Sequence, residues 1–240
     1  MSIFRRRNAD AIWQGVYRSF AEVPSAGAGF AGDVWAEHLS RQHEAARSGA
    51  WNDEFVHEHE ALLLLICLIG RPLHIVDYGG GYGASYHYVR AMLPNVLMRY
   101  DVVEVPAVVA AAPRSGDELR FSTSFDDGVP DIVFVKSALQ YVEDYRGTLA
   151  SLFGLASRFV LLEKFSGVTS ASYVSAQRNV EGSVFPYWFL SIDEITGIAK
   201  DARYDCVLHR RLARMYDQSE FPVELRMGQA STLLFARKSS

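Results

Sequence analysis

The chain has 240 residues, of which 49% are apolar and 22% are charged, and its 24 basic and 28 acidic residues give a formal net charge of −4. This length and apolar content allow a sizeable core, which excludes a disordered chain. The slightly acidic balance argues against a dedicated nucleic-acid binder, because such proteins usually present a basic face. The longest apolar run, Ala61 to Gly70, has about half of the ~20 residues that a membrane-spanning helix needs, so we expect no membrane span.

The cysteine content indicates the redox compartment. Cys67 and Cys206 lie far apart in the sequence and are too few for a disulfide framework or a zinc site. We therefore expect a reducing, cytoplasmic environment.

The first part of the chain predicts a small N-terminal helical cap, residues 1–71. Helical spacing of apolar residues predicts a helix from Ala9 to Phe20, followed by a turn-rich linker at 24–29. Two further helices are expected, from Val34 to Ser48 and from Phe55 to Ile69. The last of these is apolar almost all round, which predicts burial.

From Leu73 onward, strand and helix patterns alternate. Apolar strands are expected at 73–77, 100–105, 119–124, 131–135 and 159–163, with helices at 84–93, 107–112 and 146–157 between them. Ser191 and Glu194 form a capping box that opens a helix ending near Lys200. Two final strands, 204–212 and 231–238, are joined by a loop long enough for antiparallel pairing.

This alternation predicts an α/β fold. We expect a Rossmann-like, doubly wound, mostly parallel seven-stranded sheet with an antiparallel final strand pair. It occupies residues 72–240 and carries an insertion at about 166–190.

A glycine-rich turn between the first strand and the next helix is the sharpest motif. The segment 76–84 reads VDYGGGYGA, and Gly79-x-Gly81-x-x-Ala84 formally fits a dinucleotide-binding fingerprint. Glycines there let the backbone turn tightly and bring a ligand into contact with main-chain N–H groups.

Two acidic residues shift the interpretation away from a dinucleotide. Asp77 lies two residues before the first glycine, where its carboxylate would repel a pyrophosphate but suit a cationic amino group. Glu104 ends the next strand, where a carboxylate can accept two hydrogen bonds from a ribose diol. A ligand with an ammonium group, a ribose and no phosphate is S-adenosylmethionine, which we expect as the cofactor.

These motifs resemble those of the class I S-adenosylmethionine-dependent methyltransferases. The segment Asp77-x-Gly79-Gly80-Gly81-x-Gly83 is similar to their first motif, Glu104 to the acid that ends their second strand, and residues 131–141 to their fourth motif. The resemblance covers about residues 73–238. It implies a methyltransferase domain at 72–240 and cofactor binding by Asp77, Gly79, Gly80, Gly81, Gly83 and Glu104.

A narrower resemblance is carried by three further segments. Val103-Glu104-x-Pro106, Ser137-x-Leu139-Gln140-Tyr141 and Phe185-Pro186-x-Trp188 are similar to a little-characterised group of bacterial methyltransferases, often associated with surface-polysaccharide gene clusters. That group has an aspartate or arginine-rich element after the fifth strand. Here Glu163-Lys164-Phe165 stands instead, so the role of that element is not carried over.

Polar residues after the third and fourth strands complete the predicted cofactor site. Ser137 and Gln140 follow a buried strand at its carboxyl end, where ligands bind in open α/β sheets, although an ordinary helix start explains them equally well. Asp126 or Asp127, after the third strand, is placed to meet the adenine amino group, and a turn role explains either residue equally well.

A hydroxyl acceptor requires a general base, whereas in-line alignment supplies much of the rate of methyl transfer. The candidates are Glu163 at the end of the fifth strand, which Lys164 alternatively neutralises, together with Tyr141 and His87. His57 and His59 lie two apart on one predicted helix and point different ways, so we expect no metal site.

An aromatic segment, 183–189, lies in the insertion before the capped helix. We expect Tyr187 and Trp188 to bind the acceptor beside the methyl donor, under the N-terminal cap, since aromatic faces suit sugar rings. The alternative is that both belong to the core, as aromatic residues in such segments usually do.

The leading hypothesis is a methyltransferase acting on a small molecule, with O-methylation of a carbohydrate or related metabolite as its specific form. We expect no nucleic-acid partner, and a homodimer is one option for assembly. Two alternatives stay open. One is an NAD(P)-dependent oxidoreductase using the same glycine loop, against which Asp77 and the antiparallel final strands argue. The other is a non-catalytic S-adenosylmethionine-binding partner protein, since no base stands out.

Overall fold

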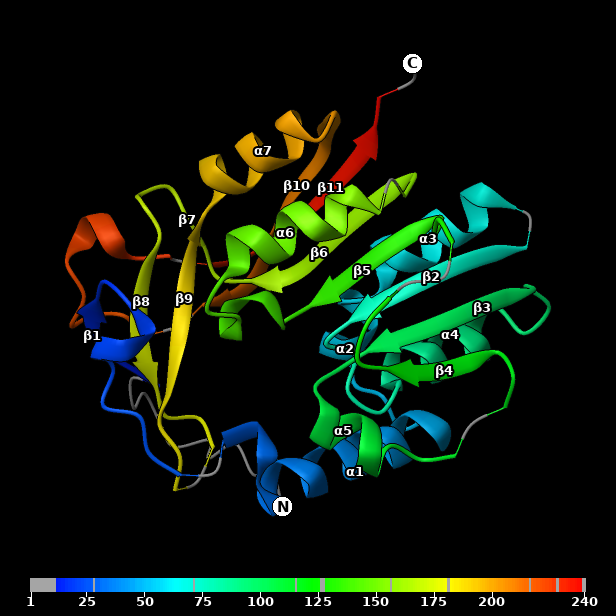
Figure 1. Cartoon of the computed structure of the whole chain (residues 1–240), viewed down its shortest axis with the longest axis horizontal. Coiled ribbons are helices and arrows are strands. Elements are labelled where there is room, and N and C mark those ends of the chain that lie inside the picture. Colours follow the sequence, from blue (N-terminus) through cyan, green and yellow to red (C-terminus); the bar gives the residue numbers. More distant parts are fainter. Residues whose placement is uncertain are drawn as a thin grey trace.

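The computed structural model describes residues 12–27, 29–70, 72–114, 116–125, 128–155, 157–180, 182–215, 217–227 and 229–238. These residues form a seven-stranded sheet covered by helices and a second, four-stranded sheet beside it (Figure 1). The strand order of the large sheet is β10-β11-β6-β5-β2-β3-β4.

The large sheet confirms the predicted fold class. Its strands are β2 (Leu73–Tyr78), β3 (Met98–Val103), β4 (Leu119–Ser122), β5 (Ile132–Lys136), β6 (Phe159–Phe165), β10 (Tyr204–Met215) and β11 (Gln229–Arg237). β2 pairs in parallel with β3 on one side and β5 on the other, and β5 pairs in parallel with β6. β11 runs opposite to the other strands of this sheet and pairs antiparallel with both β6 and β10.

Helices cover both faces of this sheet, which is why its central strands are continuously apolar. The helices are α1 (Asp33–Arg47), α2 (Asp53–His57), α3 (Glu60–Ile69), α4 (Ala84–Met92), α5 (Pro106–Ala111), α6 (Tyr145–Gly154) and α7 (Ile192–Asp201). Phe134 of β5 packs into a core cluster with α3 and α4, while Val133 and Val135 pack with α6 and α7. α3 and α4 therefore lie behind the sheet in Figure 1, and α6 and α7 in front of it.

The N-cap predicted for α7 is confirmed, but the return bond of a capping box is replaced by one from the backbone N–H of Ser191 to Oγ of Ser172, at 2.8 Å. The side chain of Ser191, at the N-cap, accepts a hydrogen bond from the backbone N–H of Glu194. This bond satisfies one of the free N–H groups at the start of the helix and fixes where β9 ends and α7 begins.

The predicted helix from Ala9 to Phe20 is wrong over Trp13–Tyr17, which forms strand β1; residues 1–11 lie outside the described part of the chain. Gly15, in the left-handed region at φ 74°, disfavours a helix there, and β8 (Tyr173–Gln177) provides a strand to pair with. The N-terminal segment is thus not wholly helical. That residues 1–71 form a separate domain, with the next domain beginning at residue 72, stays a prediction.

The predicted helix from Phe55 to Ile69 is divided into α2 and α3 at Glu58 and His59. The ring of His59 explains the break. Its Nδ1 lies 2.6 Å from the carbonyl oxygen of Phe55. In a continuous helix, that oxygen would accept a hydrogen bond from the backbone N–H of His59. That backbone N–H bonds to Val56 instead, at 3.0 Å.

The insertion predicted at 166–190 contains most of the second sheet. Its order is β1-β8-β9-β7, with β7 (Gly167–Val168) and β9 (Phe185–Ser191). This sheet lies beyond the carboxyl ends of β5 and β6 (Figure 1). Short 3₁₀ helices complete the described structure: Phe20–Glu22, Gly29–Ala31, Leu139–Tyr141 and Val223–Leu225. Within the described ranges, no helix is long and apolar enough to cross a bilayer.

Candidate functional site

The glycine loop connects β2 to α4, as the motif predicted. Gly81 adopts the left-handed conformation at φ 58°, and a Cβ there would lie 2.7 Å from Cδ2 of Leu39 on α1. A Cβ on Gly80 would lie 2.5 Å from the Oδ2 atom of Asp77. This turn requires glycine, because Leu39 of α1 and the carboxylate of Asp77 lie too close to leave room for a Cβ. Gly79 and Gly83 complete the loop, and Gly83 is the N-cap of α4.

Asp77 is buried at the end of β2, with 1% of its surface exposed. Its Oδ2 atom accepts a hydrogen bond of 2.8 Å from the hydroxyl of Tyr100 on β3. No described residue gives a hydrogen bond to its Oδ1 atom. Burial raises the pKa of Asp77 to about 7, against the lowering effects of Tyr100 and Lys136. The site therefore contains a buried carboxyl group with one vacant acceptor atom.

Glu104 follows β3 and binds the glycine loop directly. Its Oε1 atom accepts a hydrogen bond of 3.0 Å from the backbone N–H of Gly81, and its Oε2 atom one of 2.9 Å from that of Val105. Burial raises the pKa of Glu104, and these two backbone bonds oppose the rise. The structure thus brings Asp77, Glu104 and the glycines together. Asp126 and Asp127 lie outside the described residues.

The ends of β5 and β6 share an unusual backbone conformation. Ser137 at φ 52° and Lys164 at φ 53° both lie in the left-handed region, which residues other than glycine rarely adopt. The hydroxyl of Ser137 donates to the carbonyl of Lys164 at 3.1 Å, and Nε2 of Gln140 donates to the same oxygen at 3.1 Å. Such strained positions cluster at functional sites. The sequence carried no signal for either conformation.

Gln140 points into the protein between the two sheets. Its Nε2 atom also donates to the hydroxyl of Tyr187 at 3.4 Å, and that hydroxyl lies 2.6 Å from Oγ of Ser166. Oε1 of Gln140 is buried, and no part of the chain that the structure describes donates to it. A second buried acceptor is thus vacant at the carboxyl end of the sheet.

The three predicted base candidates are not brought together. Glu163 is fully buried at the end of β6, where Oγ1 of Thr232 donates to its Oε1 atom at 2.5 Å and Nη2 of Arg210 lies 3.4 Å away. Burial raises the pKa of Glu163 to about 7, with Thr232 and Arg210 opposing the rise. This value suits a base, but the carboxyl group is fully buried against Thr232 and Arg210, and Arg210 in turn binds Glu60 and the carbonyl of His57.

Tyr141 and His87 lie in two other environments. The hydroxyl of Tyr141 donates to Oε1 of Gln177 on β8 at 2.8 Å, which places it against the second sheet. The ring of His87 packs edge-on against that of His43, with centroids 4.7 Å apart, between α4 and α1. Burial, with His43 and Arg47, lowers the pKa of His87 to about 4, so its imidazole is neutral at pH 7.

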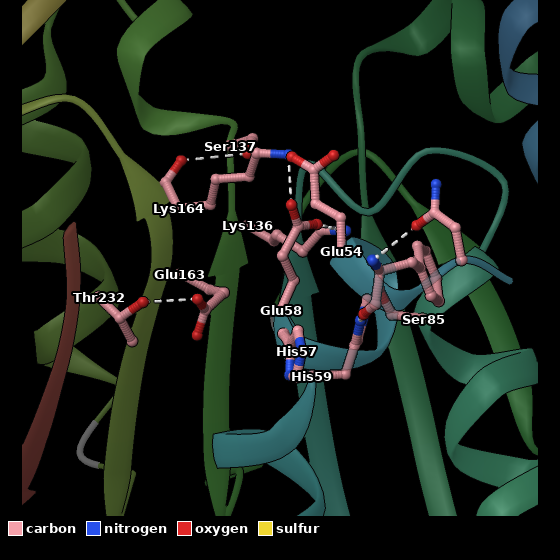
Figure 2. Close-up of polar contacts among 12 residues, drawn as sticks. Glu54, His57, Glu58, His59, Ser85, Lys136, Ser137, Glu163, Lys164 and Thr232 are labelled. Carbon is pink, nitrogen blue, oxygen red and sulfur yellow. Dashed lines mark hydrogen bonds and ion pairs between the residues drawn. The ribbon is translucent and has the colours of Figure 1, made fainter. Parts of the chain in front are cut away.

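A partly buried ion-pair cluster near Glu163 was not anticipated (Figure 2). Glu58, at the corner between α2 and α3, pairs with Lys136 at 3.0 Å and also with Lys164. Lys164 pairs in addition with Glu54 at 3.1 Å. Burial would raise the pKa of Glu58, but the two lysines hold it below its ordinary value. The sequence signal available for this cluster was the four-residue spacing of Glu54 and Glu58, together with lysines at the ends of two buried strands.

Tyr187 and Trp188 do not line one pocket, because adjacent residues of β9 point to opposite faces. Trp188 is 7% exposed, packs against Tyr145 with ring centroids 5.1 Å apart, and donates from Nε1 to the carbonyl of Glu143 at 3.2 Å. Tyr187 faces Trp13 and Tyr141 instead, at centroid distances of 5.4 and 5.2 Å. The expectation of a shared pocket is therefore corrected, and acceptor binding stays a prediction for Tyr187.

Two other expectations concern cysteines and metals. Cys67 and Cys206 are both free and exposed. No group of three or more histidine, cysteine or acidic side chains capable of holding a metal ion is found among the described residues.

Comparison with known proteins supports the fold. No protein-family model matches the chain, and no curated protein sequence matches it. The structure is similar to the 1,6-didemethyltoxoflavin-N1-methyltransferase of Burkholderia thailandensis with bound 1,6-didemethyltoxoflavin and S-adenosylhomocysteine. The TM-score is 0.55 at 16% identity, over 97% of this chain and 99% of that one.

Two further structures have the same fold. An amino pentose methyltransferase of Micromonospora echinaspora with bound S-adenosylmethionine aligns at TM-score 0.55 and 14% identity, over 81% of this chain and 96% of that one. The magnesium protoporphyrin IX methyltransferase of Synechocystis with bound S-adenosylhomocysteine aligns at TM-score 0.52 and 12% identity, over 83% and 99%. At these identities the likeness shows the Rossmann-like fold of class I methyltransferases.

Proposed function

We propose that the protein is an S-adenosylmethionine-dependent methyltransferase that acts on a small molecule. One observation carries the proposal. Asp77 and Glu104 end neighbouring parallel strands on either side of a glycine loop, and the buried Oδ1 atom of Asp77 lacks a donor among the described residues. In open α/β sheets this edge is where ligands bind.

The residues present fit this cofactor. Oδ1 of Asp77 would accept from its ammonium group, and the carboxylate of Glu104 has lone pairs left for the ribose hydroxyls after accepting from Gly81 and Val105. The bound cofactor supplies an electrophilic methyl group on a sulfonium. Leu39, packed close to Gly81, would help to exclude water from the loop.

We place the acceptor at the ends of β5 and β6, facing the second sheet. Ser137 and Gln140 would form the wall between cofactor and acceptor, and Tyr187 and Tyr141 would contact the acceptor. Glu163 has the pKa of a general base, but its side chain is fully buried, so it can reach an acceptor only if the packing around it opens. Tyr141 is therefore our first candidate for the hydroxyl group that orients the acceptor.

We also propose that the acceptor is a carbohydrate or related metabolite, that the protein forms a homodimer, and that it is located in the cytoplasm. The Micromonospora structure is that of an amino pentose methyltransferase and the Burkholderia structure that of an N-methyltransferase. Screening should therefore include nucleotide sugars, oligosaccharides and nitrogen heterocycles.

The chain's self-association is measured by sedimentation equilibrium.

The test is calorimetric titration with S-adenosylmethionine, S-adenosylhomocysteine and NADH. We expect both adenosyl ligands to bind and NADH not to bind, since Asp77 would repel a pyrophosphate. Binding of NADH alone would refute the proposal in favour of an oxidoreductase. Cofactor binding with no methyl transfer to any screened acceptor would favour a non-catalytic cofactor-binding protein.

A further inference from the structure

Behind Asp77, three more buried side chains extend toward the corner of α2 and α3. The hydroxyl of Tyr100 on β3 donates to Oδ2 of Asp77 at 2.8 Å. Burial raises the pKa of Tyr100, and the Ser85 hydroxyl on α4 is close enough to oppose the rise. Oγ of Ser85 lies 2.9 Å from Nε2 of His59 (both residues are labelled in Figure 2). All four side chains are buried.

His59, at the other end of this series of side chains, has a defined proton arrangement. Nδ1 of His59 lies 2.6 Å from the carbonyl oxygen of Phe55, which can only accept, so Nδ1 carries a proton. Burial holds the pKa of His59 well below its ordinary value, so the ring is neutral and Nε2 has a free lone pair. Nε2 therefore accepts the hydroxyl proton of Ser85.

We propose that Tyr100 is a positioning residue for the cofactor site. It holds Oδ2 of Asp77 so that Oδ1 faces the ammonium group of the methyl donor, and Ser85, which is bonded to His59, lies beside its hydroxyl. The inference rests on the proposed function, in which Asp77 binds the cofactor.

These four groups have two hydrogen-bond arrangements, and only the first joins all of them. When Asp77 is protonated on Oδ2, it donates to Tyr100, Tyr100 donates to Ser85, and Ser85 donates to His59, so every donor has an acceptor. When Asp77 is ionised, Tyr100 donates back to Oδ2 and leaves Oδ1 open to a cation, while Ser85 still donates to His59, so no proton joins Tyr100 to Ser85. Binding of an ammonium group selects the second arrangement.

The charged and titratable groups around Asp77 set the pH at which this exchange occurs. They are Tyr100 and Glu104 from the β3 side and Lys136 from β5. Burial raises the pKa of Asp77 to about 7, and the hydrogen bond from Tyr100 lowers it. Removing the hydroxyl therefore raises the pKa further, and a higher pH is needed to ionise Asp77.

The experiment is titration with S-adenosylhomocysteine from pH 6 to pH 8.5, on the wild type and on Tyr100→Phe, Ser85→Ala and Asp77→Asn. S-Adenosylhomocysteine keeps the ammonium group and lacks the sulfonium, so it reports on Asp77. For Tyr100→Phe we expect about tenfold weaker binding at pH 6.5, the effect of one hydrogen bond to a charged group, shrinking toward pH 8.5. Ser85→Ala, which preserves the Tyr100 ring, should shift the pH profile in the same direction by less.

Each outcome decides one of the two claims. If Asp77→Asn binds weakly but Tyr100→Phe and Ser85→Ala both keep the wild-type affinity and pH profile, the positioning role is overturned and the proposed function survives. If Asp77→Asn itself binds like the wild type, its cofactor role fails and the inference fails with it. Should Tyr100→Phe not fold, the pH profile of Ser85→Ala decides alone.

Discussion

The hydroxyl of Ser137 at the end of β5 donates to the carbonyl of Lys164 at the end of β6, and both residues adopt a left-handed backbone. Two neighbouring parallel strands thus each have a left-handed residue at the same edge of the sheet, and a side-chain bond joins the two residues. The bond and the strain have opposite effects on stability, and the two can be separated by substitution.

Ser137→Ala removes the bond and keeps the strain, so we expect the free energy of unfolding to fall by about 1 kcal/mol. Ser137→Gly also removes the bond but relieves a left-handed conformation worth about 1–2 kcal/mol, so its stability should stay near that of the wild type. Urea denaturation of the three proteins measures the difference. Equal stabilities for the alanine and glycine variants would show that the backbone is not strained there.

Glu104→Ala should weaken S-adenosylhomocysteine binding by about 2–4 kcal/mol, roughly 30-fold or more, because it removes a charged acceptor for two hydroxyl groups. It also releases the backbone N–H groups of Gly81 and Val105. Glu104→Gln is the matched control, because it keeps an oxygen for Gly81 and loses the charge. Calorimetry that finds wild-type affinity in Glu104→Ala would rule out the ribose assignment.

Gly81→Ala should weaken cofactor binding and lower stability by about 1–2 kcal/mol, because alanine is strained in the left-handed region and its Cβ meets Leu39. Gly197→Ala is the control, since that glycine lies within α7 with nothing within 4 Å of an added Cβ. It should leave binding unchanged and stabilise the helix by about 0.5–1 kcal/mol. Calorimetry and thermal melting distinguish the two. A Gly81→Ala protein with unchanged affinity would mean that the loop is only structural.

Trp188→Ala should lower the free energy of unfolding by about 3–5 kcal/mol, because it empties a buried volume beside Tyr145. Tyr187→Phe, on the opposite face of β9, removes only a hydroxyl and should cost about 1 kcal/mol. Chemical denaturation measures both. A Trp188→Ala protein as stable as the wild type would return Trp188 to the list of acceptor-binding candidates.

Glu163 should make the protein less stable as the pH rises from about 4.5 to about 7. Its pKa is raised to about 7 in the folded state, so in that window the folded protein binds more protons at this group than the unfolded chain. The resulting loss in the free energy of unfolding is about 3 kcal/mol and is complete above pH 7. Glu163→Gln should remove it, so the stability difference between variant and wild type should grow in favour of the variant across this window. Denaturation curves from pH 4 to pH 8 test this, and a constant difference would contradict it.

Local stereochemistry made several parts of the fold predictable. A strand that is buried on both faces must be apolar, so the central strands were visible as apolar runs. The turn after β2 requires glycine at positions where a Cβ would strike Leu39 or Asp77, so the loop was visible as a motif. Asp77 and Glu104 were predictable as a pair because parallel neighbouring strands end at the same edge.

Long-range pairing was decided only in the tertiary structure. β1 pairs with β8, and the hydroxyl of Ser175 donates to the carbonyl of Gly15, 160 residues away. The local periodicity of residues 9–20 favoured a helix, but backbone groups bond to whichever partner the fold brings near, and that partner is remote in sequence. His59 divides a helix for the same reason, since its ring bonds to Phe55 and to Ser85 of another element.

The chemistry of the site likewise depends on burial that a sequence does not display. A carboxyl at the end of a strand has an ordinary pKa in water, and enclosure raises that of Asp77 and of Glu163 to about 7. Residue types and their spacing therefore determined which groups reach the site. Only the packing of Tyr100, Lys136 and the α2–α3 corner around them decided how those groups are charged and which of their atoms remain free.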